Sequence, residues 1–159
     1  MNKEIILMLH PTFGVLAMLA AVWLFVEVVN VNTVNGVNLQ NQQRIKFSSM
    51  TVAILIWLSY IIGGYWYVQF YAPDKAIIKA GPWPFAHSFF METKEHLFFV
   101  LLLIATYLPI VVAGKQWIAE RSARTLLLTL AALVVLLGLA MEGSGAIVGL
   151  GVKMGLLEK

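Results

Sequence analysis

The chain is 159 residues long, with 60% hydrophobic residues, 12% charged residues and a formal net charge of +3. Soluble domains carry about 25% charged residues, so this chain cannot cover a globular surface with polar side chains. The composition excludes a soluble enzyme and a nucleic-acid-binding protein, and it predicts an integral membrane protein in a lipid bilayer. The absence of cysteine excludes disulfides, thiolate metal sites and covalently attached c-type haem.

Four apolar runs are long enough to cross a membrane, which takes about 20 residues of α-helix. In chain order they cover approximately residues 5–29, 50–71, 90–113 and 124–143. They predict an all-α fold, in which residues 1–159 form a single transmembrane domain built as a four-helix bundle. An even number of spans places both termini on the same side of the membrane. Because the first run has spanning length, we expect no secretory signal peptide.

The connecting segments differ in character. Residues 30–46 are rich in Asn and Gln and predict a polar loop, with a helix cap at Ser48-Ser49 before the second span. Pro73 predicts the end of that span, and residues 73–84 predict a non-helical loop at the membrane surface. The sequence Glu142-Gly143-Ser144-Gly145 predicts an interruption of the fourth helix.

Basic residues set the expected orientation. Lys and Arg occur in similar numbers at both ends of the predicted bundle, but residues 30–46 and 114–124 concentrate theirs in short loops. The positive-inside rule then places those two loops in the cytoplasm and the termini outside it, in a bacterial inner membrane. Glu27 is expected within reach of the first of these polar loops.

Four polar side chains from four different spans are predicted at one depth, near the side of the termini. They are His10, Tyr67, His96 and Glu142. Each is separated from the opposite end of its helix by a similar number of residues, which corresponds to about 27 to 30 Å of α-helix. Ionisable groups inside a membrane usually face the bundle interior and a partner, so this layer is the candidate site.

Small residues accompany the layer. Gly14 lies one helical turn from His10, and Gly145 and Gly149 share a helical face with Glu142. Such spacing either lets two helices approach closely or leaves room for a flat group between them. Both interpretations remain open from the sequence, and an aromatic belt at the membrane surface is the alternative interpretation of Tyr67.

Imidazole is a common axial ligand of haem iron, and a haem between helices needs two such ligands at the same depth. The sequence predicts one haem b held by His10 and His96 on adjacent helices, with Gly14 and Tyr67 beside it. His87 precedes His96 by nine positions and points to the opposite face of a continuous helix, so it is an alternative partner for His10. The chain has three histidines, which excludes two bis-histidine haems.

The start of the chain also supports this hypothesis. Leu9-His10-Pro11, followed by Thr12-Phe13-Gly14 and by a histidine at the start of the third span, resembles small four-helix b-type cytochromes of bacterial membranes. The resemblance implies haem b and either transmembrane or quinone-linked electron transfer. A redox subunit of this kind is expected to meet another subunit or redox protein on the side of the termini.

Alternative interpretations stay open. Glu92 and His96 share a helical face and, with His10 and Glu142, predict a His/Glu metal site of the kind that iron or copper uses. Glu142 is a candidate proton acceptor for a quinol, or else a carboxylate at the membrane edge. We therefore expect an electron-transfer subunit rather than a stand-alone enzyme, with a cofactor-free assembly subunit of a larger membrane complex as the alternative function.

Overall fold

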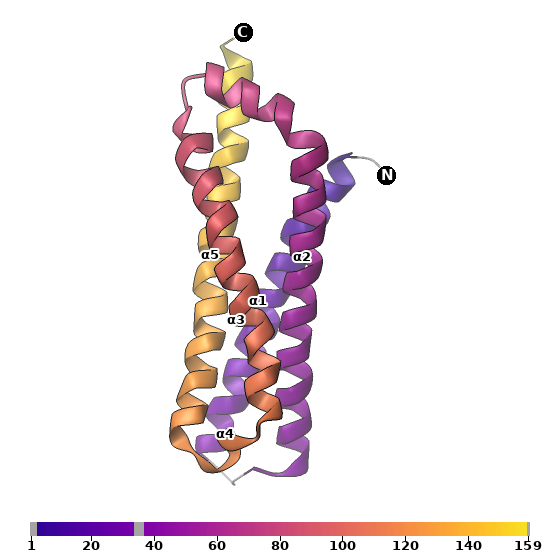
Figure 1. Cartoon of the computed structure of the whole chain (residues 1–159), viewed down its shortest axis with the longest axis vertical. Helices are drawn as coiled ribbons and strands as arrows, with labels where there is room; N and C mark the ends of the chain where they lie inside the picture. The colour runs from indigo at the N-terminus through magenta and orange to yellow at the C-terminus, as the bar shows by residue number, and fades with distance from the viewer. Residues whose placement is uncertain (1–2, 34–36, 159) are drawn as a thin grey trace.

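The computed structural model describes residues 3–33 and 37–158, in which all regular structure is helical. Four long helices run along the long axis of the molecule (Figure 1): α1 (Lys3–Thr33), α2 (Leu39–Ala80), α3 (Glu92–Ala113) and α5 (Arg121–Leu157). Each is long and apolar enough to cross a membrane. Residues 34–36 of the predicted polar loop lie outside the described part.

Two short helices mark the ends of the bundle. The four-residue helix α4 (Gln116–Ala119) lies at the end that we call the lower end, as drawn in Figure 1. The π-helical turn η1 (Ala86–Met91) lies at the upper end and leads directly into α3. The start of α1 and the end of α5 also lie toward the upper end.

The four long helices form a square in which α1 and α3 are diagonally opposed. α1 packs against α2 and α5, and α3 packs against the same two helices. The sequence prediction placed α1 and α3 next to each other, and this is wrong. The diagonal arrangement follows from which faces of the four helices are apolar and small enough to pack, which residue depth alone does not specify.

The lower part of the bundle is a dry aliphatic core. Ala17, Ala21, Leu24 and Val28 of α1 recur at helical spacing and are fully buried. They belong to one cluster with apolar side chains of the other three long helices. In a membrane such packing stabilises the bundle through van der Waals contacts, which small residues increase by letting helices approach.

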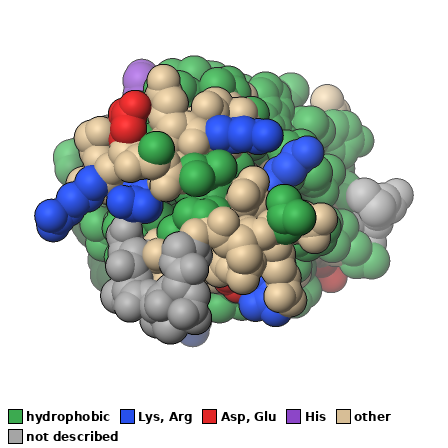
Figure 2. Space-filling view, turned by 90° about the horizontal axis from the view of Figure 1, so that it is seen from below, with side chains coloured by type: hydrophobic (Ala, Val, Ile, Leu, Met, Phe, Trp, Pro, Cys, Tyr) green, Lys and Arg blue, Asp and Glu red, His purple; other side chains and the backbone are tan. Residues whose placement is uncertain are grey.

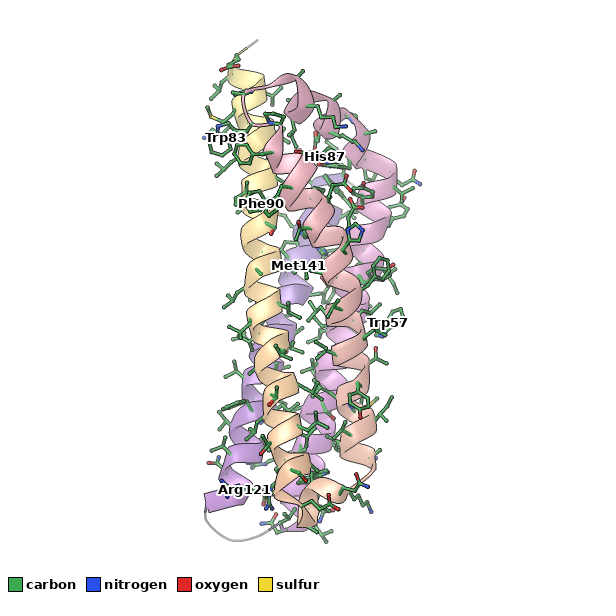
Figure 3. The ribbon with its side chains drawn as sticks, turned by 60° about the vertical axis from the view of Figure 1, so that its left-hand side comes forward. Trp57, Trp83, His87, Phe90, Arg121 and Met141 are labelled. Atoms are coloured by element: carbon green, nitrogen blue, oxygen red, sulfur yellow. The ribbon has the colours of Figure 1, made fainter. Side chains whose placement is uncertain are left out.

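The outer surface is also apolar. Leu103 and Leu136 are more than 60% exposed, and Trp57 points away from the bundle at mid-height (Figure 3). Monomeric soluble proteins rarely expose large contiguous apolar patches, whereas this surface matches the hydrocarbon of a bilayer. The four-helix membrane architecture expected from the sequence is thus compatible with both the interior and the exterior of the molecule.

The lower end carries basic side chains. Figure 2 shows this end from below, with Lys and Arg side chains spread across it among hydrophobic side chains. Near it, Glu27 is 8% exposed and accepts hydrogen bonds from Trp23 Nε1 at 3.0 Å and from Arg44 at 3.4 Å. Arg44 belongs to the polar segment, so the expected contact between Glu27 and that segment is confirmed.

Helix α2 is longer at both ends than the sequence predicts. Ser48 and Ser49 are not caps: their hydroxyls donate to the carbonyls of Ile45 and Lys46 inside the helix. The actual cap is Asn38, whose side chain accepts a hydrogen bond from the backbone N–H of Asn41 at 2.8 Å. Asn is an effective N-cap, and the helix that it begins already includes the Ser pair.

Pro73 does not end α2, because it lies inside a helix that continues to Ala80. The upper part of α2 bends over the end of the bundle toward η1 and α5 (Figure 1), as expected where proline removes one helical hydrogen bond. Tyr71 and Ile78, on either side of the proline, are both buried in an upper cluster. This packing offsets the lost hydrogen bond, so the predicted loop is helical up to Ala80.

Helix α5 continues through Glu142-Gly143-Ser144-Gly145 to Leu157, so the predicted interruption is also wrong. Its later glycines allow close packing. A Cβ atom on Gly151 would lie 2.7 Å from Cβ of Ala86, and one on Gly155 would lie 2.8 Å from the carbonyl oxygen of Ile77. Contacts with η1 and α2 therefore stabilise a glycine-rich segment whose intrinsic helix propensity is low.

Candidate functional site

A cavity of about 440 Å³ lies between the aliphatic core and the upper cluster. All four long helices and η1 contribute to its wall. Toward the upper end, α1 and α2 separate from α3 and α5 (Figure 1). The polar and aromatic residues that line the cavity are His10 of α1, Tyr60, Trp66, Tyr67 and Asp74 of α2, and Lys94, Glu95, Phe98 and Phe99 of α3.

The cavity opens to the outer surface of the bundle. Leu7, Val68 and Phe99 line it, although 44%, 74% and 54% of each residue is exposed. Gly64 and Gly149 also line it, and a Cβ atom at either position would have no atom within 4 Å. The cavity is therefore open along the side of the bundle, next to exposed apolar side chains.

His10 is held in one orientation by α2. Its Nδ1–H donates to the carbonyl oxygen of Ser59 at 2.8 Å, and the hydroxyl of Ser59 donates to the carbonyl oxygen of His10 at 3.0 Å. The ring lies directly against Gly63 and 6.1 Å from the ring of Phe98. Because a carbonyl oxygen can only accept, Nδ1 carries the proton, and Nε2 of the neutral ring is an acceptor.

Glu142 and Lys94 lie near each other beside His10, although no ion pair within 4.0 Å joins them among the described residues. A Cβ atom on Gly14 would lie 2.8 Å from Oε1 of Glu142, so the carboxylate fills the space that Gly14 leaves. Nζ of Lys94 lies over Gly145, close enough for its charge to act on Glu142. The gap at Gly14, predicted to admit a flat ligand, is thus occupied by a side chain of α5.

Tyr67 lies on the cavity wall, as a residue of the predicted polar layer, and its side chain interacts with Glu95. Oε1 of Glu95 is buried and has no hydrogen-bond partner among the described residues. Most buried polar atoms in folded proteins are paired, so an unpaired carboxylate oxygen beside a cavity needs an explanation. A bound ligand with a hydroxyl group would provide one.

His87 does not reach the cavity. It is 2% exposed, its Nδ1 lies 3.1 Å from the hydroxyl of Tyr71, and its Nε2 lies 3.4 Å from Oε1 of Glu92. In Figure 3, His87 lies toward α2, whereas Trp83 and Phe90 lie against α5. Both ring nitrogens of His87 are engaged, so this histidine joins η1 to α2.

His96 lies on another side of α3. It is exposed, its Nδ1–H donates to the carbonyl oxygen of Glu92 at 2.6 Å, and it shares a helical stripe with the exposed residues Leu103 and Tyr107. His87 and His96 therefore face different sides, in agreement with their spacing. His96 is not part of the cavity wall.

The donor set does not fit a haem held by two histidines in this cavity. His10 is a cavity residue with an unpaired Nε2, but His96 is exposed and His87 has both nitrogens engaged. In the part of the chain that the structure describes, no group of three or more His, Asp or Glu side chains could hold a metal ion. The pairing of His10 with His96 on one iron stays a prediction that this conformation does not assemble.

Sequence reasoning missed several residues of the site. Neither Lys94 nor Ser59 was predicted as a site residue, although Ser59 accepts the hydrogen bond that orients His10. One signal was present: Met91, Glu95 and Phe98 are spaced to share a face of α3, and all three line the cavity.

Comparison with family models, with curated proteins and with solved structures gave no match to this chain.

Proposed function

We propose that this chain is a membrane electron-transfer subunit that binds a quinone-type carrier in the cavity between its four long helices. The observation that supports this is the combination of aromatic walls, an opening to the bilayer and ionisable side chains in one cavity. A quinone headgroup is a flat ring with apolar faces and two polar oxygens. Tyr60, Phe98 and Phe99 offer aromatic contacts to the ring, and His10 and Glu95 offer polar contacts to the oxygens.

The ionisable groups suit this carrier because quinones exchange protons together with electrons. His10, Lys94 and Glu95 all line the cavity, and Glu142 lies near Lys94 beside it. Charged and titratable residues at membrane depth are costly, and they are usually kept for ion, proton or substrate pathways. Helix packing alone requires none of these side chains.

We assign the cavity to a quinone rather than to haem b because one histidine, not two, lies on its wall among the described residues. Under this proposal the upper end of the bundle, with the start of α1 and the end of α5, faces the extracytoplasmic side. The basic lower end faces the cytoplasm, in agreement with the positive-inside rule. A redox partner, either another subunit or a separate protein, exchanges electrons with the carrier near the upper end.

Ligand binding to the full chain in detergent tests the proposal. Fluorescence of Trp66, which lines the cavity, should be quenched in a saturable way by a short-chain ubiquinone or menaquinone analogue. His10→Ala should weaken this binding about tenfold or more, because it removes a polar contact that costs about 1.4 kcal/mol to lose. The matched control is His96→Ala, which removes an exposed imidazole outside the cavity and should leave binding unchanged.

Two results would overturn the proposal. Absence of saturable binding to the folded chain would favour the alternative function, a cofactor-free assembly subunit of a larger complex. An absorption spectrum of haem b in the purified protein, lost in both His10→Ala and His96→Ala, would restore the bis-histidine haem hypothesis instead.

A further inference from the structure

We propose that Tyr71, His87 and Glu92 form a proton path between the cavity and the water at the upper end of the bundle. This inference rests on the proposed function, because a quinone-type carrier exchanges protons with its surroundings when it changes redox state. The three residues belong to α2, η1 and α3, and they lie outside the wall of the cavity. Their role is therefore separate from binding of the carrier.

The cavity needs such a path because of what surrounds it. A hydroquinone that gives two electrons to the redox partner becomes a quinone and releases two protons. Below the cavity lies the dry aliphatic core, and its side opening lies next to exposed apolar residues such as Leu7 and Val68. Under the proposed function, lipid covers that opening. The remaining direction for the protons is through the upper cluster, where Tyr71 and His87 are buried.

Tyr67 connects the cavity to the path. It lines the cavity and interacts with Glu95, whose buried Oε1 has no hydrogen-bond partner among residues 3–33 and 37–158. Four residues further along α2, Tyr71 leaves the same helical face, and its ring stacks on that of Tyr67 with 5.0 Å between the centroids. One water molecule is enough to connect the hydroxyls of two such tyrosines.

His87 is the central group of the path. Its Nδ1 lies 3.1 Å from the hydroxyl of Tyr71, and its Nε2 lies 3.4 Å from Oε1 of Glu92. An ionised carboxylate can only accept, so the neutral ring carries its proton on Nε2 and accepts at Nδ1. When the hydroxyl of Tyr71 gives its proton to Nδ1 and regains one from the cavity side, Nε2 can pass its own proton to Glu92.

Glu92 is the exit of the path. Its side chain is 46% exposed, whereas that of His87 is 2% exposed, so a proton that reaches Glu92 has reached the surface. Glu92 and Glu95 of α3 and Lys75 and Lys79 of α2 all act electrostatically on His87. The carboxylates stabilise the transient imidazolium, and the lysines favour its deprotonation.

The test follows protonation of a bound probe. The probe is 2-hydroxy-1,4-naphthoquinone, an acidic quinone whose absorbance changes when it ionises, and the full chain is held in phospholipid nanodiscs and in excess over the probe. After a pH jump in a stopped-flow instrument, the bound probe should change its protonation state about tenfold faster or more than excess duroquinone displaces it. Protonation no faster than displacement would overturn the inference.

Variants assign the fast protonation to the named residues. His87→Asn and Glu92→Gln each keep a side chain that forms hydrogen bonds but remove the proton-carrying group. Each should slow protonation of the bound probe about tenfold or more and leave its affinity unchanged. Added imidazole should restore part of the rate in His87→Ala, which a purely structural role of His87 does not predict.

Glu158→Gln is the matched control, since it neutralises another exposed carboxylate in the last residues of the described chain and should keep the wild-type rate. A wild-type rate in both His87→Asn and Glu92→Gln would show that the protons take another route.

The outcomes separate this inference from the proposed function. Saturable binding of the probe, with protonation limited by its displacement, overturns the path and leaves quinone binding intact. Absence of saturable binding by the probe and by duroquinone alike overturns the proposed function itself.

Discussion

Gly63 of α2 and His10 of α1 are in such close contact that a Cβ atom on Gly63 would lie 2.5 Å from Nδ1 of His10. At the neighbouring Gly64, a Cβ atom would have no atom within 4 Å. The absence of a side chain at Gly63 is what lets the imidazole reach the carbonyl oxygen of Ser59, one turn earlier on α2. This contact sets both the orientation and the tautomer of the cavity histidine.

Gly63→Ala should therefore displace His10 and break its hydrogen bond to Ser59. We expect a loss of stability of about 1–3 kcal/mol, the usual effect of overpacking, and about tenfold weaker quinone binding. Thermal unfolding in detergent, followed by circular dichroism, measures the loss of stability. Quenching of tryptophan fluorescence measures quinone binding. Gly64→Ala is the matched control, and equal effects of the two substitutions would contradict this account.

Lys94 and Glu142 should behave as an energetically coupled pair. Lys94→Met leaves the half-buried carboxylate of Glu142 without its counter-charge and should destabilise the chain by roughly 1–2 kcal/mol, less than a fully buried pair would lose. Combining it with Glu142→Gln should recover most of that loss. A double-mutant cycle of thermal stabilities gives the coupling, and strictly additive effects would show that the two charges do not interact.

Glu27 should stabilise the pairing of α1 with the start of α2. Glu27→Gln weakens its hydrogen bonds from Trp23 and Arg44 and should cost about 1 kcal/mol of stability. The coupling with Arg44→Met should be about 0.2–1 kcal/mol, because Arg44 is 53% exposed and solvent or lipid headgroups screen it. Lys46→Met, two residues after Arg44 and exposed, serves as the control and should change stability little.

Gly155 should be required for docking of the end of α5. A Cβ atom there would lie 2.8 Å from the backbone carbonyl oxygen of Ile77, and backbone cannot move aside as a flexible side chain can. Gly155→Ala should lower stability by about 1–3 kcal/mol and increase hydrogen exchange in the last turns of α2 and α5. Gly149→Ala, where a Cβ atom meets open space, should be tolerated, and similar losses in both variants would argue against close packing as the cause.

The boundaries of the helices show where local signals were insufficient. Pro73 and the glycines from Gly143 to Gly155 are unfavourable within helices, and the sequence predicted breaks at both places. The structure keeps both segments helical because Tyr71, Ile78 and Gly151 are packed against other elements at the upper end. The residues that make such tertiary contacts are far apart in the sequence, so the helix propensities of single residues cannot predict them.

The sequence predicted how deep in the bundle the candidate site residues lie, but not the direction in which their side chains point. Counting residues along each helix placed His10, Tyr67, His96 and Glu142 in one layer, and His10 and Tyr67 do line one cavity. The same count could not tell that His96 points out of the bundle or that Glu142 fills the gap at Gly14. The direction in which a side chain points depends on which face of its helix packs against the other helices. In α3 the face with Lys94 and Glu95 lies toward the cavity.

The scarcity of charge, with 12% charged residues, and the four apolar runs by themselves determined that this chain is a four-helix protein suited to a membrane. Those properties follow from chain length and solvent, because a spanning helix must be apolar over a fixed distance. Only the tertiary structure decided that α1 and α3 are diagonal, that Gly63 locks His10 onto Ser59, and that Glu95 meets His10 across one cavity. Those properties depend on packing between distant segments, where a single missing Cβ atom sets the position of a functional side chain.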